Sequence, residues 1–468
     1  MTCQYKHLRI YSRERGYLPC HHQNVINERQ MNMKLIQTPV KGMQDFLPRD
    51  MALREHVLGV IRQTYGRYGF SQIETPVMEH IENLTGKNGG ENEKLIFKVE
   101  KRGRELEKCL ERIRKEEGIS AEAAGTQLAD SALRYDLTVP LCRYYANHKN
   151  ELPSPFKALQ IGNVFRADNP QKGRFRQFTQ CDIDIIGDAS AMAEIELIAA
   201  TCDALHRIFA EVGVSGFTVH VGDRRILRAM AKSAGFAEEE SDEVFIILDK
   251  MDKIGLDGVR QELTGSGFCP DHVDRYIGFF REFAKDQTQD PSAFIQRTCA
   301  DQIEDGVEQS IGMILSTARA MISEDITLKF DPTLVRGMGY YTGTIFEISI
   351  DNYSFSIAGG GRYDRMVGRF CGQDAPACGF SIGFERIVTI LRDLGWEENF
   401  TTPRKAYLVD LKSASSRITE VFSLAAKERA EGIPVVVQPL KKNAKFQVET
   451  LEQEGYTQIR KVYGDTQL

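Results

Sequence analysis

The stretch VFRADNPQKGRFRQF, residues 164–178, decides the fold. It predicts the end of one strand, a polar turn over Asn169–Gly173 and a second strand that returns beside the first. Arg174 and Arg176 would share one face of the returning strand, because side chains alternate between its two faces. A guanidinium fork pairs well with phosphate oxygens, so the hairpin indicates a polyphosphate site. A salt-bridged sheet face is the alternative.

The residues that follow continue this polar pattern. Gln180, Asp182 and Asp184 alternate with apolar residues, so their three side chains are expected on one face of a strand. A carboxylate beside an amide can hold an ammonium group or an imidazole N–H. The alternative is a polar strand face that binds no ligand.

Glycine-rich segments mark three further places. LVRGMGYYTG at 334–343 suits a pocket in which the backbone approaches a ligand closely, and AGGGRYD at 358–364 is a second glycine-rich run. CGFSIGFERI at 378–387 predicts a glycine-spaced strand followed by a helix. Arg386, near the start of that helix, could reach a terminal phosphate.

The composition is that of an ordinary globular protein. The chain has 468 residues, with 60 Lys and Arg against 66 Asp and Glu and a formal charge of −6. This length indicates roughly two to four domains. No apolar run approaches the ~18 residues of a membrane-spanning helix. No GxxxxGK[ST] segment is present, which excludes a P-loop NTPase.

The cysteines and the N-terminus bear on the compartment. Ten cysteines are scattered along the chain without a CxxC pair. This spacing disfavours a disulfide framework and a zinc site, and it favours reduced thiols in a cytoplasmic protein. The N-terminus lacks an apolar stretch of signal-peptide length, so secretion is disfavoured.

The pattern of the chain changes at several places. Residues 1–33 hold five basic and two acidic side chains and predict a disordered extension or a misassigned start. Residues 34–222 and 326–400 mix helices and strands, whereas residues 223–325 look mainly helical. The expected elements are, in chain order, a helix at 50–68, a helix at 101–117, strand-like runs over 133–187, a helix at 188–209 and strands over 344–357.

Residues 403–468 predict a small α/β domain. Strands and helices alternate there, with a strand at 406–411, a helix at 418–429, a strand at 434–438, a helix at 444–454 and a strand at 458–463. Eleven Lys and Arg against eight Asp and Glu make this part modestly basic.

In their order and spacing, these segments resemble the histidyl-tRNA synthetase family of class II aminoacyl-tRNA synthetases. Residues 38–46 and LRYDLTVP at 133–140 also match the family. The resemblance covers about residues 34–440. It implies an α+β fold with an antiparallel sheet, flanking helices and a helical insertion. The catalytic domain would span 34–222 and 326–400, the insertion 223–325, and a short anticodon-binding-like domain 403–468.

The resemblance assigns arginines to ATP. Arg166 would hold the α-phosphate and the substrate carboxylate, and Arg336 would lie across the α-phosphate from it. Arg174 and Arg176 would face the nucleotide. Arg386 would bind the γ-phosphate.

The resemblance also implies a histidine pocket. Its residues would be Asp136, Thr138, Arg166, Gln180, Asp184, Arg336, Tyr340 and Tyr341. Asp136 and Thr138 would bind the α-amino group. Gln180 and Asp184 would contact the amino group and the imidazole, and the two tyrosines would close the pocket. No metal ligand is assigned on the protein.

The implied activity is the ligation of L-histidine to tRNA-His. ATP, with Mg²⁺ on its β- and γ-phosphates, would form histidyl-adenylate, and histidine would pass to the tRNA 3′ end. Asn169–Lys172 would contact the acceptor stem, and Pro76 would lie at a homodimer interface. Two departures from the family pattern are Gly339, where an acidic residue is common, and a short C-terminal domain. A histidine-binding regulatory subunit and an RNA sensor are the alternatives, and the phosphate-binding arginines favour the enzyme.

Overall fold

A computed structural model describes residues 35–85, 94–116, 118–171, 173–214, 216–286, 290–335, 340–397 and 403–467. The predicted extension at 1–33 lies outside these ranges, as do Arg336 and Gly339. None of the described helices is long and apolar enough to cross a membrane.

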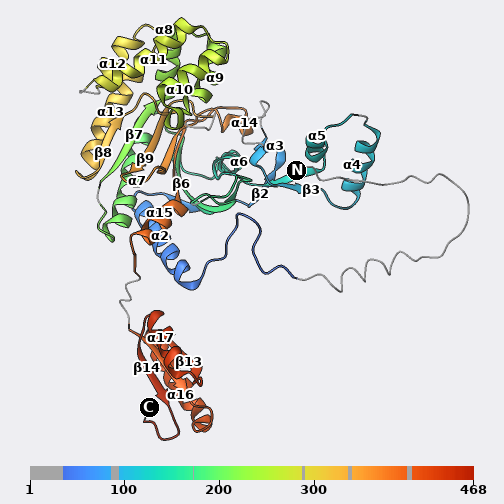
Figure 1. The fold of residues 1–468 in the computed structure, drawn as a ribbon, viewed down its shortest axis with the longest axis vertical. Coiled ribbons are helices and arrows are strands. Elements are labelled where there is room, and N and C mark those ends of the chain that lie inside the picture. The colour runs from blue at the N-terminus through green and yellow to red at the C-terminus, as the bar shows by residue number, and fades with distance from the viewer. Residues whose placement is uncertain are drawn as a thin grey trace, which may run out of the picture. The chain divides into compact units, whose positions relative to one another are not determined.

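A large sheet forms the centre of the main body (Figure 1). Within the described ranges it has eight strands in the order β1-β5-β6-β11-β10-β9-β7-β8. Neighbours are antiparallel except for the β1–β5 and β7–β8 pairs. The strands are β1 (Ser71–Ile73), β5 (Phe156–Phe165), β6 (Gln177–Ile186), β7 (Phe217–Asp223), β8 (Thr327–Phe330), β9 (Thr344–Ile350), β10 (Ser356–Arg362) and β11 (Ala377–Ile382). The predicted α+β class with a largely antiparallel sheet is confirmed.

The hairpin predicted from residues 164–178 is formed by β5 and β6, which pair along their whole length. The returning strand begins only at Gln177, so the prediction that Arg174 and Arg176 share its face is wrong. Both arginines lie in the connecting loop, where Asp168 holds them. Arg174 donates twice to the Asp168 carboxylate, and Arg176 Nε donates to the Asp168 carbonyl.

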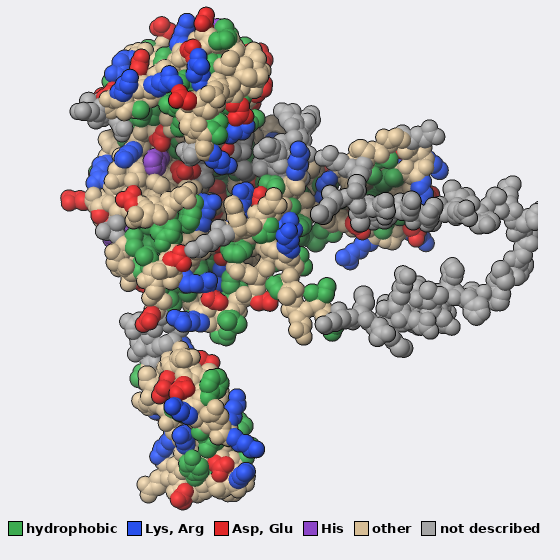
Figure 2. All heavy atoms as spheres, in the orientation of Figure 1, with side chains coloured by type: hydrophobic (Ala, Val, Ile, Leu, Met, Phe, Trp, Pro, Cys, Tyr) green, Lys and Arg blue, Asp and Glu red, His purple; other side chains and the backbone are tan. Residues whose placement is uncertain are grey.

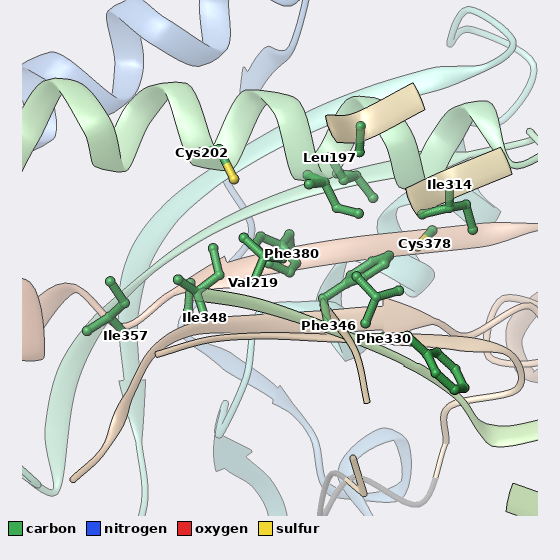
Figure 3. Packing of buried hydrophobic residues seen from close by; sticks show 14 of the residues in the cluster. Leu197, Cys202, Val219, Ile314, Phe330, Phe346, Ile348, Ile357, Cys378 and Phe380 are labelled. Atoms are coloured by element: carbon green, nitrogen blue, oxygen red, sulfur yellow. The ribbon is translucent and has the colours of Figure 1, made fainter. Parts of the chain in front are cut away.

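Three helices pack together beside the sheet: α2 (Pro48–Arg67), α7 (Met192–Ala210) and α15 (Phe384–Asp393). Helices α7 and α15 contact strands of the sheet, and α2 contacts both of these helices. Helix α7 is apolar on nearly all sides, which is typical of a helix buried in a core. Figure 3 shows Leu197 and Cys202 of α7 above Val219, Phe346 and Phe380 of the sheet. This packing is the main hydrophobic core.

Helices occupy most of residues 224–321. They are α8 (Arg224–Ala234), α9 (Ser241–Leu248), α10 (Met251–Gly265), α11 (Pro270–Lys285), α12 (Pro291–Thr298) and α13 (Val307–Met321). Helix α8 packs on β7 and β9, and α13 packs on α7 and β8. Acidic and basic side chains intermingle on the surface of these helices (Figure 2).

Residues 138–148 depart from the expected strand-like pattern, because they form helix α6 (Thr138–His148). Pro140 lies in the first turn of α6, where a missing N–H breaks no intrahelical bond. Asp136 Oδ1 accepts from Val139 N at 3.1 Å and helps to begin the helix. Nearby lie a small sheet of β2 (Met78–His80), β4 (Ala129–Leu133) and β3 (Lys98–Glu100), and the helices α3 (Ile81–Leu84), α4 (Gly103–Lys115), α5 (Ala121–Gln127) and α14 (Gly368–Cys371).

Residues 403–467 form a parallel sheet with a helix on each face. Its strands are β13 (Val435–Pro439), β12 (Arg404–Val409) and β14 (Tyr456–Val462), in that order. Helix α16 (Ile418–Ala430) packs Val421 near Tyr407, and α17 (Ala444–Gln453) packs Leu451 near Ala406 and Leu408. Successive residues of β12 thus point to opposite faces of the sheet and contact different helices. The strands and helices alternate along the chain, as the sequence predicts.

A buried ion pair joins β10 to α7. Arg362 donates to both Glu194 oxygens, at 2.7 and 2.6 Å, and both side chains are almost fully buried. We expect Glu194→Ala to lower the free energy of unfolding by about 3–5 kcal/mol, because it removes the buried counter-charge of the guanidinium and leaves only the more exposed Asp364. Urea unfolding followed by the fluorescence of Trp396, the only tryptophan, measures this.

The matched control is Glu105→Ala, which removes the partner of Lys108 from an exposed pair. Exposed pairs contribute little, so this variant should unfold like the unchanged protein. Equal midpoints for the Glu194→Ala variant and the unchanged protein would contradict the structural role of the buried pair.

Candidate functional site

A cavity of about 360 Å³ opens where the β5–β6 hairpin, β10, β11 and the start of α15 meet. The structure brings nine of the predicted site residues together on its wall: Asp136, Thr138, Arg166, Arg174, Gln180, Asp184, Tyr340, Tyr341 and Arg386. Arg176 is not part of the described wall, because its guanidinium is turned to the Asp168 carbonyl. Arg336 lies outside the described residues.

One part of the wall carries acceptors for which the described residues offer no donor. Asp136 Oδ2, Gln180 Oε1 and Asp184 Oδ2 are buried and, within the described structure, have no hydrogen-bond partner. An unsatisfied buried polar group costs about 1–3 kcal/mol, and more if it is charged. A ligand with several N–H donors would remove this cost.

The carboxyl group of Asp184 packs closely against Gly379. Asp184 pairs with Gly379 across β6 and β11, and a Cβ on Gly379 would come within 2.0 Å of Asp184 Oδ1. Tyr363 donates its hydroxyl to the same oxygen at 2.5 Å. Burial raises the pKa of Asp184 to about 7, opposed by the Tyr363 hydrogen bond and assisted by the charge of Asp136.

Asp136 sits at the start of α6. Its Oδ1 accepts from Val139 N, and its Oδ2 has no donor among the described residues. Burial raises the pKa of Asp136 to about 6, and the Val139 hydrogen bond and the charge of Arg166 oppose the rise. Both site carboxyls therefore titrate near neutral pH, which is frequent at functional sites.

The arginines of the wall are anchored by their neighbours. Arg166 Nε donates to the Tyr135 carbonyl at 2.9 Å, and its guanidinium lies 5.1 Å from the Phe178 ring centroid. Arg386 donates to the Ser356 carbonyl at 2.5 Å. These contacts orient the guanidinium groups, which suits them to fork-like recognition of phosphate or carboxylate.

A second buried ion pair stabilises the elements that carry these arginines. Arg54 of α2 donates to both oxygens of Glu385, at 2.6 and 2.9 Å. Glu385 Oε1 also accepts from the backbone N of Thr179 at 3.1 Å. Helix α2, strand β6 and the start of α15 are thereby joined, and the helix turn that carries Arg386 is positioned.

Aromatic rings close the acceptor side. The Tyr340 ring lies 5.0 Å from the Tyr341 ring and 6.1 Å from the Tyr363 ring, both edge to face. Tyr341 packs against the Cα of Gly361, where a Cβ would come within 3.0 Å of its ring. The glycine-rich strand therefore lets the rings approach the backbone.

Sequence reasoning left four residues of this site without a role: Asp182, Tyr363, Gly379 and Ser381. The period of two in the Gln180–Asp184 segment placed Asp182 on the correct face, and the glycine-rich segments contained the other three. Their roles depend on the register between β6 and β11, which no local pattern indicates.

Comparisons with known proteins identify the family of the chain. The model of the family described as histidyl-tRNA synthetase matches residues 42–107 and 125–387. A histidine–tRNA ligase of Leifsonia xyli is 45% identical over 358 residues, which are 76% of this chain and 80% of that protein. A probable histidine–tRNA ligase of Tropheryma whipplei is 38% identical over 436 residues, 91% of this chain and 95% of that one.

Solved structures show the same fold. A histidyl-tRNA synthetase from Nostoc sp. PCC 7120 superposes with a TM-score of 0.70 at 26% identity, covering 90% of each chain. A Bacillus halodurans C protein, described as an ATP phosphoribosyltransferase regulatory subunit/histidyl-tRNA synthetase, gives 0.69 at 22% identity, covering 92% of this chain and all of that one. At 22% identity, the similarity to the Bacillus halodurans C protein supports the fold only. The fold is that of a class II aminoacyl-tRNA synthetase.

The chain belongs to the histidyl-tRNA synthetase family.

Gly379→Ala tests the close approach at Asp184. The new methyl group would occupy the place of Asp184 Oδ1, and the carboxylate would have to leave the Tyr363 hydroxyl. We expect the affinity for a ligand held by Asp184 to fall at least tenfold. Calorimetric titration with L-histidine measures this.

The matched control is Gly372→Ala on the turn after α14, where a Cβ would meet no atom within 4 Å. Its positive φ adds local backbone strain but leaves the cavity unchanged. Unchanged histidine affinity in the Gly379→Ala variant would contradict the packing described for Asp184.

Proposed function

We propose that this protein is a histidine–tRNA ligase that activates L-histidine with ATP and transfers the histidyl group to the 3′ end of tRNA-His. The observation that supports this most directly is a single cavity with buried acceptors and anchored arginines on one wall. The acceptors suit the N–H groups of histidine, and the arginines suit the phosphates of ATP.

Histidine would lie at the acceptors. Asp136 and Thr138 bind its α-ammonium group, and Gln180 and Asp184 take the remaining N–H donors. Tyr340 and Tyr341 then cover the imidazole. The support is that Asp136, Gln180 and Asp184 each offer an oxygen that no described group satisfies.

ATP would lie along the arginines. Arg166 holds the α-phosphate and the histidine carboxylate, and Arg386 holds the γ-phosphate. Arg174 faces the nucleotide, while Arg176 acts indirectly by holding Asp168. Arg336, which lies outside the described residues, is assigned to the α-phosphate by family resemblance alone.

The reaction is an in-line displacement. A carboxylate oxygen of histidine bonds to the α-phosphorus, the bond from that phosphorus to the β-bridging oxygen breaks, and pyrophosphate leaves. Charge develops on the phosphate oxygens, and fixed arginines stabilise it without reorganisation. The protein then acts by position and charge rather than through a covalent intermediate.

Mg²⁺ is assigned to ATP rather than to the chain. No group of three or more His, Cys, Asp or Glu side chains in the described ranges converges on a metal position. The ion would arrive on the β- and γ-phosphates, and the steps assigned to the protein residues do not depend on it.

The remaining partners follow the domain organisation that we propose. Residues 34–222 and 326–400 form the catalytic domain, and 223–325 the insertion. Asn169–Lys172, of which Lys172 lies outside the described residues, contacts the tRNA acceptor stem, and the short domain at 403–468 contacts the tRNA elsewhere. A homodimer forms near Pro76, beside the exposed side chains of Val77 and Met78. The eight described cysteines are all unpaired, which supports a cytoplasmic location.

The deciding experiment is histidine-dependent ATP–pyrophosphate exchange, followed by charging of tRNA-His. We expect exchange and charging by the unchanged protein, and a fall in exchange of about 100-fold or more for Arg166→Ala. Arg166→Lys keeps the positive charge but loses the forked guanidinium, so its exchange rate should be little higher than that of Arg166→Ala. Histidine binding without exchange would refute the ligase and indicate a regulatory subunit.

Histidine binding should weaken as the pH falls. Asp184 and Asp136, with pKa values of about 7 and 6, are protonated below those values, whereas an N–H donor needs them ionised. Each proton that binding displaces costs about tenfold in affinity per pH unit. Calorimetry between pH 5.5 and 8.5, in buffers of different ionisation enthalpy, measures affinity and released protons.

Asp184→Asn is the control for this pH dependence. It removes one titrating group, so its affinity is lower at high pH and fewer protons are released near pH 7. The same proton release from the variant and the unchanged protein would contradict the assignment of this titration to Asp184.

A further inference from the structure

Gln180, Ser381 and Asp182 form a chain of hydrogen bonds beside the acceptors. Gln180 Nε2 donates to Ser381 Oγ at 3.0 Å, and Ser381 Oγ donates to Asp182 Oδ1 at 2.5 Å. Ser381 and Asp182 are opposite each other in the β6–β11 register, so backbone pairing sets their separation. Asp182 is only 4% exposed.

The direction of this chain follows from the single hydroxyl proton of Ser381. When Asp182 Oδ1 accepts the hydrogen bond from that hydroxyl, Ser381 Oγ can offer only a lone pair to Gln180. The amide must then present its NH₂ group to Ser381, and Oε1 is left for another donor. Gln180 Oε1 is indeed the buried atom without a described partner.

We propose that Asp182, acting through Ser381, is a positioning residue that fixes the amide of Gln180 with its oxygen available to the substrate. The inference rests on the proposed function, since the donor that meets this oxygen is an N–H group of histidine. A reversed amide would place its own NH₂ against that N–H group, and the two donors would repel each other.

The chain keeps its direction as long as Asp182 Oδ1 accepts from Ser381 Oγ rather than donating to it. Burial and the neighbouring Asp184 raise the pKa of Asp182, while the Ser381 hydroxyl and Arg166 oppose the rise. A neutral Asn at this position could either donate to or accept from Ser381, so both amide orientations of Gln180 would become accessible. Asp182→Asn therefore tests direction at nearly constant volume.

The alternative is that Asp182 binds histidine directly, since it also lines the cavity. The two cases differ in the double variant. If Asp182 acts through Ser381, then Ser381→Ala reproduces the effect of Asp182→Asn, and the double variant is no worse than the more impaired single one. A direct contact would instead make the losses from Asp182→Asn and Ser381→Ala add in the double variant, because Ser381 holds Gln180 in either case.

The test is steady-state histidine-dependent ATP–pyrophosphate exchange with the full chain. We expect Asp182→Asn and Ser381→Ala each to raise the KM for histidine about tenfold or more, with the KM for ATP within twofold of the unchanged protein. In a Gln180→Leu background, Asp182→Asn should add no further change. Ser349→Ala removes a hydroxyl bonded to His220 elsewhere in the same sheet, and it should leave both constants unchanged.

The outcomes separate this inference from the proposed function. The positioning role is overturned if Asp182→Asn raises the KM for histidine and Ser381→Ala does not. It is also overturned if neither variant changes this KM. A further loss from Asp182→Asn in the Gln180→Leu background also overturns it. If the unchanged protein shows no exchange, the proposed function fails, and calorimetric histidine affinities of the same variants then decide the positioning role by the same pattern.

Discussion

The site depends on acceptors that the fold buries and for which the described residues provide no donor. Asp136, Gln180 and Asp184 each direct one oxygen to no described partner, although their other polar atoms are engaged. Such an arrangement destabilises the empty protein and stabilises a complex with a ligand rich in N–H groups. The raised pKa values of the two carboxyls have the same cause, since burial disfavours their charge until a cation arrives.

Close packing makes this burial possible. Gly379 lies where any side chain would displace the carboxylate of Asp184, and Gly361 lies where it would displace Tyr341. Behind this layer, the Arg54–Glu385 pair joins α2, β6 and α15, and the Arg362–Glu194 pair joins β10 to α7. These buried pairs join the helices to the sheet that carries the acceptors and the arginines. The positions of the acceptors and of the arginines therefore depend on the same sheet.

Much of this arrangement could be predicted from local pattern. The periodicity of apolar residues located α2, α7, the helices between 224 and 321, and the alternating strands and helices after residue 403. The pattern was insufficient at α6, whose apolar residues suit a strand as well as a helix and whose start depends on Asp136. It also placed the start of β6 too early, because the Asp168 contacts with Arg174 and Arg176 keep them in a loop.

The sequence by itself determined which residue types were available: arginines around the hairpin, alternating acceptors in its second strand and glycines in two later strands. These features follow from local spacing, and they were sufficient for the resemblance to a family. Only the tertiary structure decided which oxygen of each acceptor is free and which neighbour holds the other. The reason is that hydrogen-bond partners such as Gln180 and Ser381 are 201 positions apart, and strand register rather than local sequence brings them together.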